Sequence, residues 1–125
     1  MSFKLESHVG QVSAQMRRKL EKVVSRTAFN LQGRMRTDMA EEKHGREYGN
    51  HVASAPGESP AIDTGFLANS IQVEAEGLSA IVGTNADYAM HLEFGTVNME
   101  PRPFYDPAFE AERPEFEKAL REALK

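Results

Sequence analysis

The sequence has no cysteine and no tryptophan, and it contains no long apolar run. Without cysteine the chain cannot form a disulfide framework, a thiolate metal site or a thiol nucleophile. No window approaches the roughly 18 consecutive apolar residues that a membrane-spanning helix needs, and the first residues lack the apolar segment of a signal peptide. These absences predict a soluble cytosolic protein without a membrane partner.

Positive charge is also missing from the middle of the chain. Residues 47–101 contain no Lys or Arg, whereas residues 9–37 contain a single acid, Glu21, so the net charge of −4 hides a strong segregation. Such a division predicts that one surface of the folded chain attracts another surface of a neighbouring copy. The basic residues of the first range are Arg17, Arg18, Lys19, Lys22, Arg26, Arg34 and Arg36, and the acids of the second are Glu47, Glu58, Asp63, Glu74, Glu76, Asp87, Glu93 and Glu100.

The length of 125 residues and the apolar content of 40% fit one domain with a single core. No internal repeat or low-complexity tract divides the chain. We therefore expect a single domain over residues 1–125. Its expected parts are a helix at about 8–40, a long loop at about 41–62, a sheet and a junction at about 63–104, and a C-terminal helix at about 106–124.

Apolar residues recur at three- and four-residue steps from Val9 to Met39, which predicts an amphipathic helix. A continuous helix of this span measures roughly 50 Å, which exceeds the size of a compact domain of this length. We therefore expect it to project and to hide its apolar stripe against a neighbour. Gly33 is the best place for a bend. In the alternative, the helix breaks there and both halves pack on the same core.

The following segment, residues 41–62, is rich in glycine, proline and polar residues and shows no period. A segment of this length without regular structure is typically either disordered or functional. We expect a loop that is mobile in the free protein and becomes ordered on assembly.

A short helical turn is expected at residues 65–67, followed by a hairpin. Residues 70–76 alternate apolar and polar side chains, and residues 79–83 follow a Gly-Leu turn. Two strands are marginal alone, so they need a third strand or the long helix across their apolar face. The predicted fold class is α+β: a long N-terminal helix packed on a small antiparallel β-sheet, with a short helix and a C-terminal helix.

The densest group of backbone constraints lies in residues 88–104. Apolar side chains in residues 88–94 predict a short helix that is buried on one side and capped by Asn85 or Asp87. Gly95 can adopt the positive φ that ends a helix, and two prolines shortly after it prevent the helix from resuming. We expect a sharp, fixed corner here.

Two charged residues, Glu93 and Arg102, flank the turn of this corner. We predict that the Arg102 guanidinium donates hydrogen bonds to the Glu93 carboxylate and to loop carbonyls. If the pair is buried, loss of one partner costs about 3–5 kcal/mol. In the alternative, an exposed contact contributes less than about 1 kcal/mol.

The last expected element is a C-terminal helix. Asp106 and Pro107 form a favourable start with proline at the first helical position, and apolar spacing continues to Leu124. Pro114 is expected to kink or split this helix.

Four motifs occur in a fixed order along the chain. They are the Pro-Gly-rich loop from Ser54 to Pro60, the segment from Thr64 to Ser70 with the sequence Thr-Gly-Phe-Leu-Ala-Asn-Ser, the segment from Tyr88 to Thr96, and Arg102-Pro103-Phe104. In this order and spacing, the chain resembles the phage head-tail joining family over roughly residues 54–110. That family comprises small neck or minor tail-component proteins of long-tailed bacteriophages.

The resemblance implies a non-enzymatic structural protein of a tailed phage or prophage, part of the head-tail connector as a neck or tail-completion ring. The implied partners are further copies of the same chain and the neighbouring connector and tail proteins. Phage DNA would pass through the ring centre without sequence-specific binding. The protein would reside in the virion, which is assembled in the host bacterial cytoplasm.

Two groups of residues are expected to carry this role. The rigid junction is expected to consist of Tyr88, Glu93, Phe94, Gly95, Thr96, Arg102, Pro103 and Phe104. Contacts with the next subunit are expected from Val12, Met16 and Leu20 of the long helix and from Pro56, Gly57 and Pro60 of the loop.

Other functions have weaker support in the residues. No nucleophile elbow or phosphate-binding loop is present, and His44, His51 and His91, the candidates for a metal-dependent hydrolase, lack ligand spacing. We therefore predict no catalytic residue, cofactor or metal. The basic face of the long helix could bind DNA phosphates, so a small nucleic-acid-binding protein is the alternative, although no aromatic residues interleave with its arginines.

Overall fold

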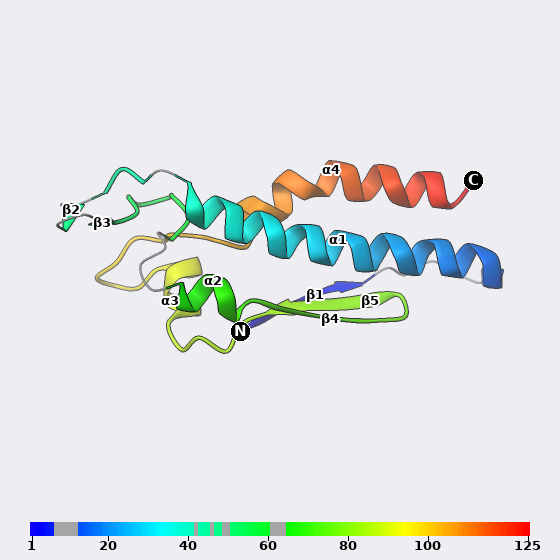
Figure 1. Ribbon diagram of the computed structural model, residues 1–125, viewed down its shortest axis with the longest axis horizontal. Helices are drawn as coiled ribbons and strands as arrows, with labels where there is room; N and C mark the ends of the chain where they lie inside the picture. The colour runs from blue at the N-terminus through cyan, green and yellow to red at the C-terminus, as the bar shows by residue number, and fades with distance from the viewer. Residues whose placement is uncertain (7–12, 42, 46, 49–50, 61–64) are drawn as a thin grey trace.

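Two long helices lie side by side on one side of a small sheet (Figure 1). The computed structural model describes residues 1–6, 13–41, 43–45, 47–48, 51–60 and 65–125. The predicted α+β class is confirmed. In chain order the elements are β1 (Ser2–Glu6), α1 (Ala14–Ala40), β2 (Glu47–Tyr48), β3 (His51–Val52), α2 (Phe66–Ser70), β4 (Gln72–Glu76), β5 (Ser79–Gly83), α3 (Ala89–Phe94) and α4 (Asp106–Ala123).

The main sheet is antiparallel with the strand order β1-β5-β4. The hairpin of β4 and β5 forms as predicted, with Gly77 at a φ of 58° in its turn. We did not predict β1, which pairs with β5 so that Phe3 lies opposite Val82. Its sequence, Ser-Phe-Lys-Leu-Glu, does alternate polar and apolar side chains, the signal of a half-buried strand. β1 thus supplies the third strand that the hairpin needs.

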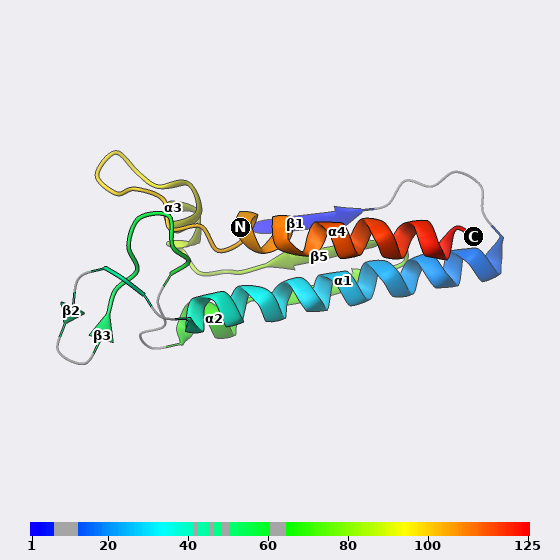
Figure 2. The same cartoon turned by 90° about the horizontal axis from the view of Figure 1, so that it is seen from above.

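The long helix α1 packs on its own chain along most of its length. It spans 27 residues, and its apolar stripe from Leu20 to Met39 is buried against the sheet and α4. The predicted projecting arm is therefore wrong, because the whole molecule is elongated along α1 and not rounded (Figure 2). The break at Gly33 that the alternative expected is absent, since α1 runs through Gly33 as one helix.

The second long helix, α4, runs antiparallel to α1. Arg34 donates a hydrogen bond of 2.6 Å to Glu112, which ties the two helices at their surface. Tyr105, just before α4, stacks on Phe3 with a ring-centroid distance of 3.5 Å and so joins the helix to β1. α4 is not split at Pro114, since it continues as one helix to Ala123.

The segment after α1 contains more regular structure than expected. β2 and β3 pair as a short antiparallel ribbon, with Tyr48 opposite His51. This ribbon extends beyond the C-terminal end of α1 (Figure 1). The described part of residues 41–62 therefore contains a short two-stranded ribbon, and its other described residues lie in turns and irregular segments.

Candidate functional site

The segment of residues 88–104, called the corner below, contains α3 and leads to the start of α4. α3 ends at Gly95, whose φ is 76° and whose amide donates to the carbonyl of His91 at 2.8 Å. A Cβ at this position would lie 2.8 Å from the carbonyl oxygen of Met99 and 2.9 Å from Pro101 Cδ. Only glycine therefore fits the turn without displacing backbone, because both the φ and the space exclude a side chain.

The carboxylate of Glu93 is the centre of the corner. Its side chain is only 6% exposed, and its Oε1 accepts hydrogen bonds from the backbone amides of Phe104 and Tyr105 at 3.0 and 2.8 Å. Its Oε2 accepts a third from the amide of Asp106 at 3.1 Å. These amides belong to the start of α4, which has no side-chain cap of its own at Tyr105. Glu93 therefore caps α4 from a distance in sequence, with its negative charge at the positive end of the helix dipole.

Arg102 lies in the corner, and both it and Glu93 are described, but the two side chains do not form an ion pair. The predicted ion pair is therefore wrong. Its guanidinium donates instead to the carbonyls of Ser54 and Glu100, each at 3.1 Å. The predicted bonds to loop carbonyls are thus present. The physical reason for the difference is that the three backbone amides already satisfy the Glu93 carboxylate, which leaves the guanidinium to bind carbonyls of the opposite partial charge.

The loop of residues 54–60 is bound to the corner and to α1. The Gly57 amide donates to the Pro101 carbonyl at 2.9 Å. Lys43 Nζ donates to Ser59 Oγ and to the carbonyl of Asp38, each at 2.6 Å, and Ser59 Oγ donates to the same carbonyl at 2.7 Å. The lysine and serine thereby satisfy a carbonyl at the C-terminal end of α1, where intrahelical partners are lacking.

A second carboxylate, that of Glu58, organises the loop internally. Its oxygens accept hydrogen bonds from His44 Nδ1 at 2.8 Å, from the Ala55 amide at 2.6 Å and from the His44 amide at 2.9 Å. These bonds, that of the His44 side chain first, lower the pKa of Glu58 to about 2. The carboxylate is therefore ionised at neutral pH and holds the two sides of the loop together.

The outer side of α3 carries exposed apolar side chains. Met90 is 58% exposed, Phe94 65%, and Val97 in the following turn is fully exposed. The predicted burial of apolar residues holds only in part: Ala89 is buried and Leu92 packs partly buried against the core, whereas Tyr88 and Phe94 are exposed. Neither predicted side-chain cap is formed, since the N-cap residue is Tyr88 and has no side-chain bond.

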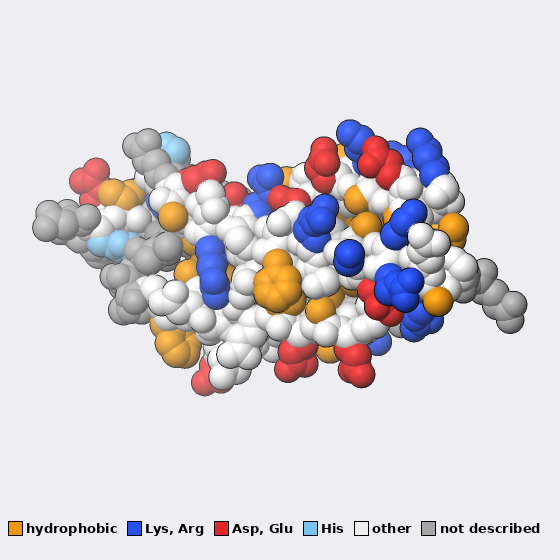
Figure 3. Space-filling model, turned by 45° about the vertical axis from the view of Figure 1, so that its right-hand side comes forward, with side chains coloured by type: hydrophobic (Ala, Val, Ile, Leu, Met, Phe, Trp, Pro, Cys, Tyr) orange, Lys and Arg blue, Asp and Glu red, His pale blue; other side chains and the backbone are white. Residues whose placement is uncertain are grey.

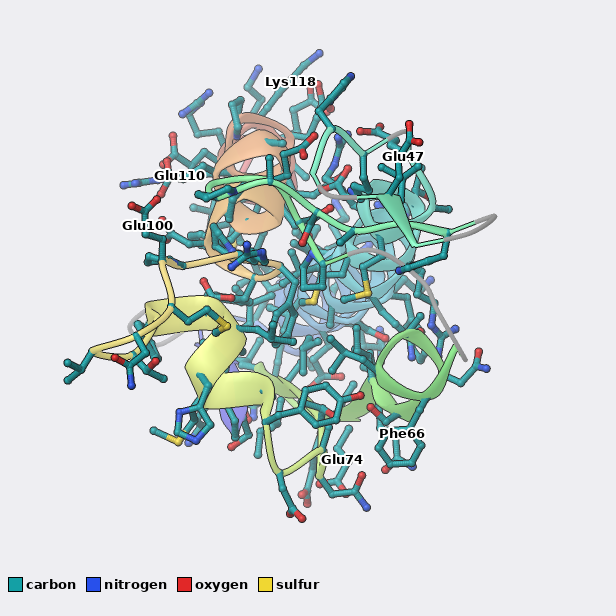
Figure 4. The ribbon with its side chains drawn as sticks, turned by 90° about the vertical axis from the view of Figure 1, so that its left-hand side faces the viewer. Glu47, Phe66, Glu74, Glu100, Glu110 and Lys118 are labelled. Carbon is teal, nitrogen blue, oxygen red and sulfur yellow. The ribbon has the colours of Figure 1, made fainter. Side chains whose placement is uncertain are left out.

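The neighbouring surface continues this apolar area. The Tyr88 ring, 42% exposed, lies 6.4 Å from that of Phe66 on α2, which is 57% exposed. Figure 4 views this end of the molecule, with Phe66 and Glu100 pointing outward at its rim. The corner therefore combines a hydrogen-bonded interior with an apolar exterior flanked by acids.

Basic side chains gather at the other end of the molecule. Figure 3 shows them over the N-terminal half of α1 and the C-terminal half of α4. The exposed members on the N-terminal half of α1 are Arg17, Arg18, Lys19, Lys22 and Arg26. Arg36, by contrast, is partly buried and donates to the Ala68 carbonyl at 2.8 Å.

The structure divides the predicted subunit-contact residues. Leu20 is fully buried in its own chain, and Pro60 is buried as well, so neither side chain is available to a neighbour. Met16 is partly exposed, and Pro56 and Gly57 are exposed. The predicted contact at Val12 falls outside the described residues.

The histidines are spread over separate elements where they are described. His44 binds Glu58, His51 lies in β3, and His91 lies in α3. Among the described residues, no group of three or more His, Cys, Asp or Glu side chains comes together as a metal site. In the same residues, no helix has both the length and the apolar character needed to cross a bilayer.

Comparison with known proteins gives the family. A family model described as "Bacteriophage HK97-gp10, putative tail-component" matches residues 1–95. The class is thus that of phage tail components. The chain belongs to the HK97-gp10-like family, because the match covers well over half of its length. No curated protein and no solved structure matches it.

This result confirms the resemblance to phage head-tail and tail-component proteins. The matched range includes the loop, the segment before β4 and the segment from Tyr88 through Gly95. The motif Arg102-Pro103-Phe104 lies beyond it, so the link of that motif to the family rests on the sequence alone. β1 and the whole of α1, which we did not use for the resemblance, lie inside the match.

Proposed function

We propose that the chain is a non-enzymatic structural protein of a tailed phage or prophage and forms part of the head-tail connector, as a neck or tail-completion ring. The observation that carries this proposal is the family match over residues 1–95. A single domain of residues 1–125 would form the subunit. Its partners would be further copies in the ring and the neighbouring connector and tail proteins.

In this proposal the corner serves as a rigid scaffold. Glu93, Gly95 and Arg102 fix the path from α3 to α4 and to the loop of residues 54–60. The exposed contact residues that remain are Met16, Pro56 and Gly57. Charge segregation would register each copy against the next, and contacts between unlike surfaces close into rings when the rotation allows.

Location and DNA passage follow from the same proposal. The protein would reside in the virion, assembled in the bacterial cytoplasm, with the DNA path through the ring centre and no sequence-specific binding. Mixed with its neighbouring connector proteins, the purified chain should appear as a closed ring by electron microscopy. Persistent failure to join such a complex would contradict the connector role.

The exposed basic side chains on α1 favour a second candidate, a small nucleic-acid-binding protein. Phosphate contacts of this kind depend steeply on salt. A filter-binding titration across salt concentrations distinguishes the two functions. Strong DNA binding that falls steeply with salt, by a chain that remains monomeric and joins no ring, would favour this second candidate.

A further inference from the structure

The middle of α1 has an exposed face that its own chain does not cover. Phe29 is 54% exposed, and Gly33 follows one helical turn later on the same face. A shallow hollow there is lined by Phe29, Asn30, Gly33, Arg34, Thr37 and Glu112. We call the surface formed by Phe29, Asn30, Gly33 and Thr37 the α1 face.

Gly33 is the unusual residue of this face. Glycine is the least favourable residue after proline in a helix interior, because it loses the most backbone freedom. A Cβ built on Gly33 would meet nothing within 4 Å, so the fold of the single chain does not require the missing side chain. A glycine in such open space leaves room for an external group to pack closely against the helix backbone.

A second surface of the same chain offers such a group. Met90 and Phe94 are four residues apart on α3 and point to the same side of the helix, with Val97 just beyond. We call these three residues the α3 stripe. They are among the most exposed apolar side chains of the described residues, and the opposite side of α3 is buried. The α3 stripe is therefore an apolar ridge, whereas the α1 face is a hollow of mixed polarity in which Phe29 is the apolar side chain.

The charges around the two surfaces are complementary. Lys22 and Arg26 are exposed on α1 within two turns before Phe29. Asp87 and Glu100 are exposed and flank the α3 stripe in the sequence, in a stretch of residues 47–101 that has no Lys or Arg. Unlike charges attract across an interface and fix its register, whereas like charges disfavour other pairings.

We propose that the α3 stripe of one copy packs on the α1 face of a second copy, with Lys22 and Arg26 opposite the acids Asp87 and Glu100. This inference rests on the proposed ring function and names its subunit contact. The two surfaces differ, so the contact is heterologous, and repetition generates a ring or a filament. The apolar area is small, so the contact is weak between free subunits and requires high local concentration.

The absence of cysteine allows a direct test by site-directed cross-linking of the purified chain at millimolar concentration. The variant carries Asn30→Cys on the α1 face and Val97→Cys beside the α3 stripe, both at exposed positions. Because each copy offers one cysteine to each neighbour, a short bis-maleimide should give a ladder of covalent oligomers. The matched control carries Gln15→Cys with Val97→Cys, which moves the first cysteine far along the same helix.

Two further changes in the cross-linking variant test the packing and the charges. Gly33→Leu places a side chain in the hollow and should abolish the ladder, while the thermal midpoint of the monomer stays the same or rises because leucine favours helix. Lys22→Glu with Arg26→Glu should lower the ladder by about tenfold or more. Adding Asp87→Lys and Glu100→Lys to that variant should restore it.

The outcomes separate this contact from the ring function itself. The contact is overturned if no ladder forms, if the Gln15 control gives an equal ladder, if Gly33→Leu leaves the ladder unchanged, or if the double reversal fails to restore it. A chain that joins the connector ring but fails these tests retains the proposed function and loses only this contact. A chain that passes them but forms no ring with connector proteins retains the contact and loses the function.

Discussion

At the scale of single residues, Glu93 holds the corner by hydrogen bonds, in addition to the prolines around it. The prolines restrict the backbone, but the carboxylate binds three amides at the start of α4 and so determines where that helix begins. Arg102 has a complementary role, since it binds the carbonyls of Ser54 and Glu100 and thereby holds the loop. One buried acid and one base thus bind backbone groups of opposite polarity.

The Glu93 contacts predict the effect of two substitutions. Glu93→Ala leaves three amides without acceptors and should lower the free energy of unfolding by about 3 kcal/mol. Glu93→Gln keeps the shape but must turn its NH₂ group toward at least one amide donor, so a loss of about 2 kcal/mol is expected. Chemical denaturation measures both losses. Glu115→Gln, an exposed change on α4, should stay within about 0.5 kcal/mol, and an equally small effect at Glu93 would contradict the capping role.

The Glu58 carboxylate of the loop is expected to titrate in acid. The pKa of Glu58 is lowered from 4.5 to about 2 by its bonds to His44 and Ala55. A lowered pKa means that the folded loop favours the ionised form, so this stabilisation is fully present above pH 4.5 and is lost as the pH falls through about 2. The Ala55 amide resonance in NMR spectra should therefore titrate near pH 2. A midpoint near 4.5, or a titration that persists in Glu58→Gln, would contradict the assignment.

At the scale of secondary structure, periodic segments could be predicted and distant hydrogen bonds could not. The apolar period predicts α1, and alternation with a glycine turn predicts β4 and β5. β1 carries the same alternating pattern, but its five residues form a strand by pairing with β5, which lies far along the chain. The cap of α4 by Glu93 has no local signal at all, because its donors lie 11 to 13 residues away.

The same scale explains why the predicted projecting arm was wrong. A rounded domain of this length would be shorter than the helix, whereas α4 and the sheet extend alongside α1 and cover its stripe. The apolar period shows that a stripe must be buried, but it does not show whether its own chain or a neighbour covers it. The predicted subunit contacts failed for the same reason. Leu20 and Met16 both follow the apolar period of α1, yet Leu20 is buried and Met16 is partly exposed.

Leu20 and Met16 therefore form a matched test of how α1 packs. Leu20→Ala removes a side chain that is 0% exposed and should lower the free energy of unfolding of the monomer by about 3 kcal/mol. Met16→Ala should cost less than about 1 kcal/mol, because Met16 is partly exposed. Thermal and denaturant unfolding at low protein concentration measure both changes. Equal, small losses would mean that α1 does not pack on its own chain.

At the scale of the whole molecule, the chain is an elongated body with two different ends. One end carries the basic side chains of α1, and the other carries the corner, the short ribbon of β2 and β3, and a surface of apolar and acidic groups. This difference between the two ends suits repeated contacts between unlike surfaces of neighbouring copies. Together with membership of the HK97-gp10-like family, it supports a structural role in the phage tail region.

The connector role is tested most directly by electron microscopy of particles that the encoding phage or prophage assembles without this chain. Because a missing joint leaves head filling intact and blocks tail attachment, the proposal predicts DNA-filled heads with no tails, and normal particles when the chain is supplied again. Particles that carry tails of normal length and attachment in the absence of the chain would contradict it.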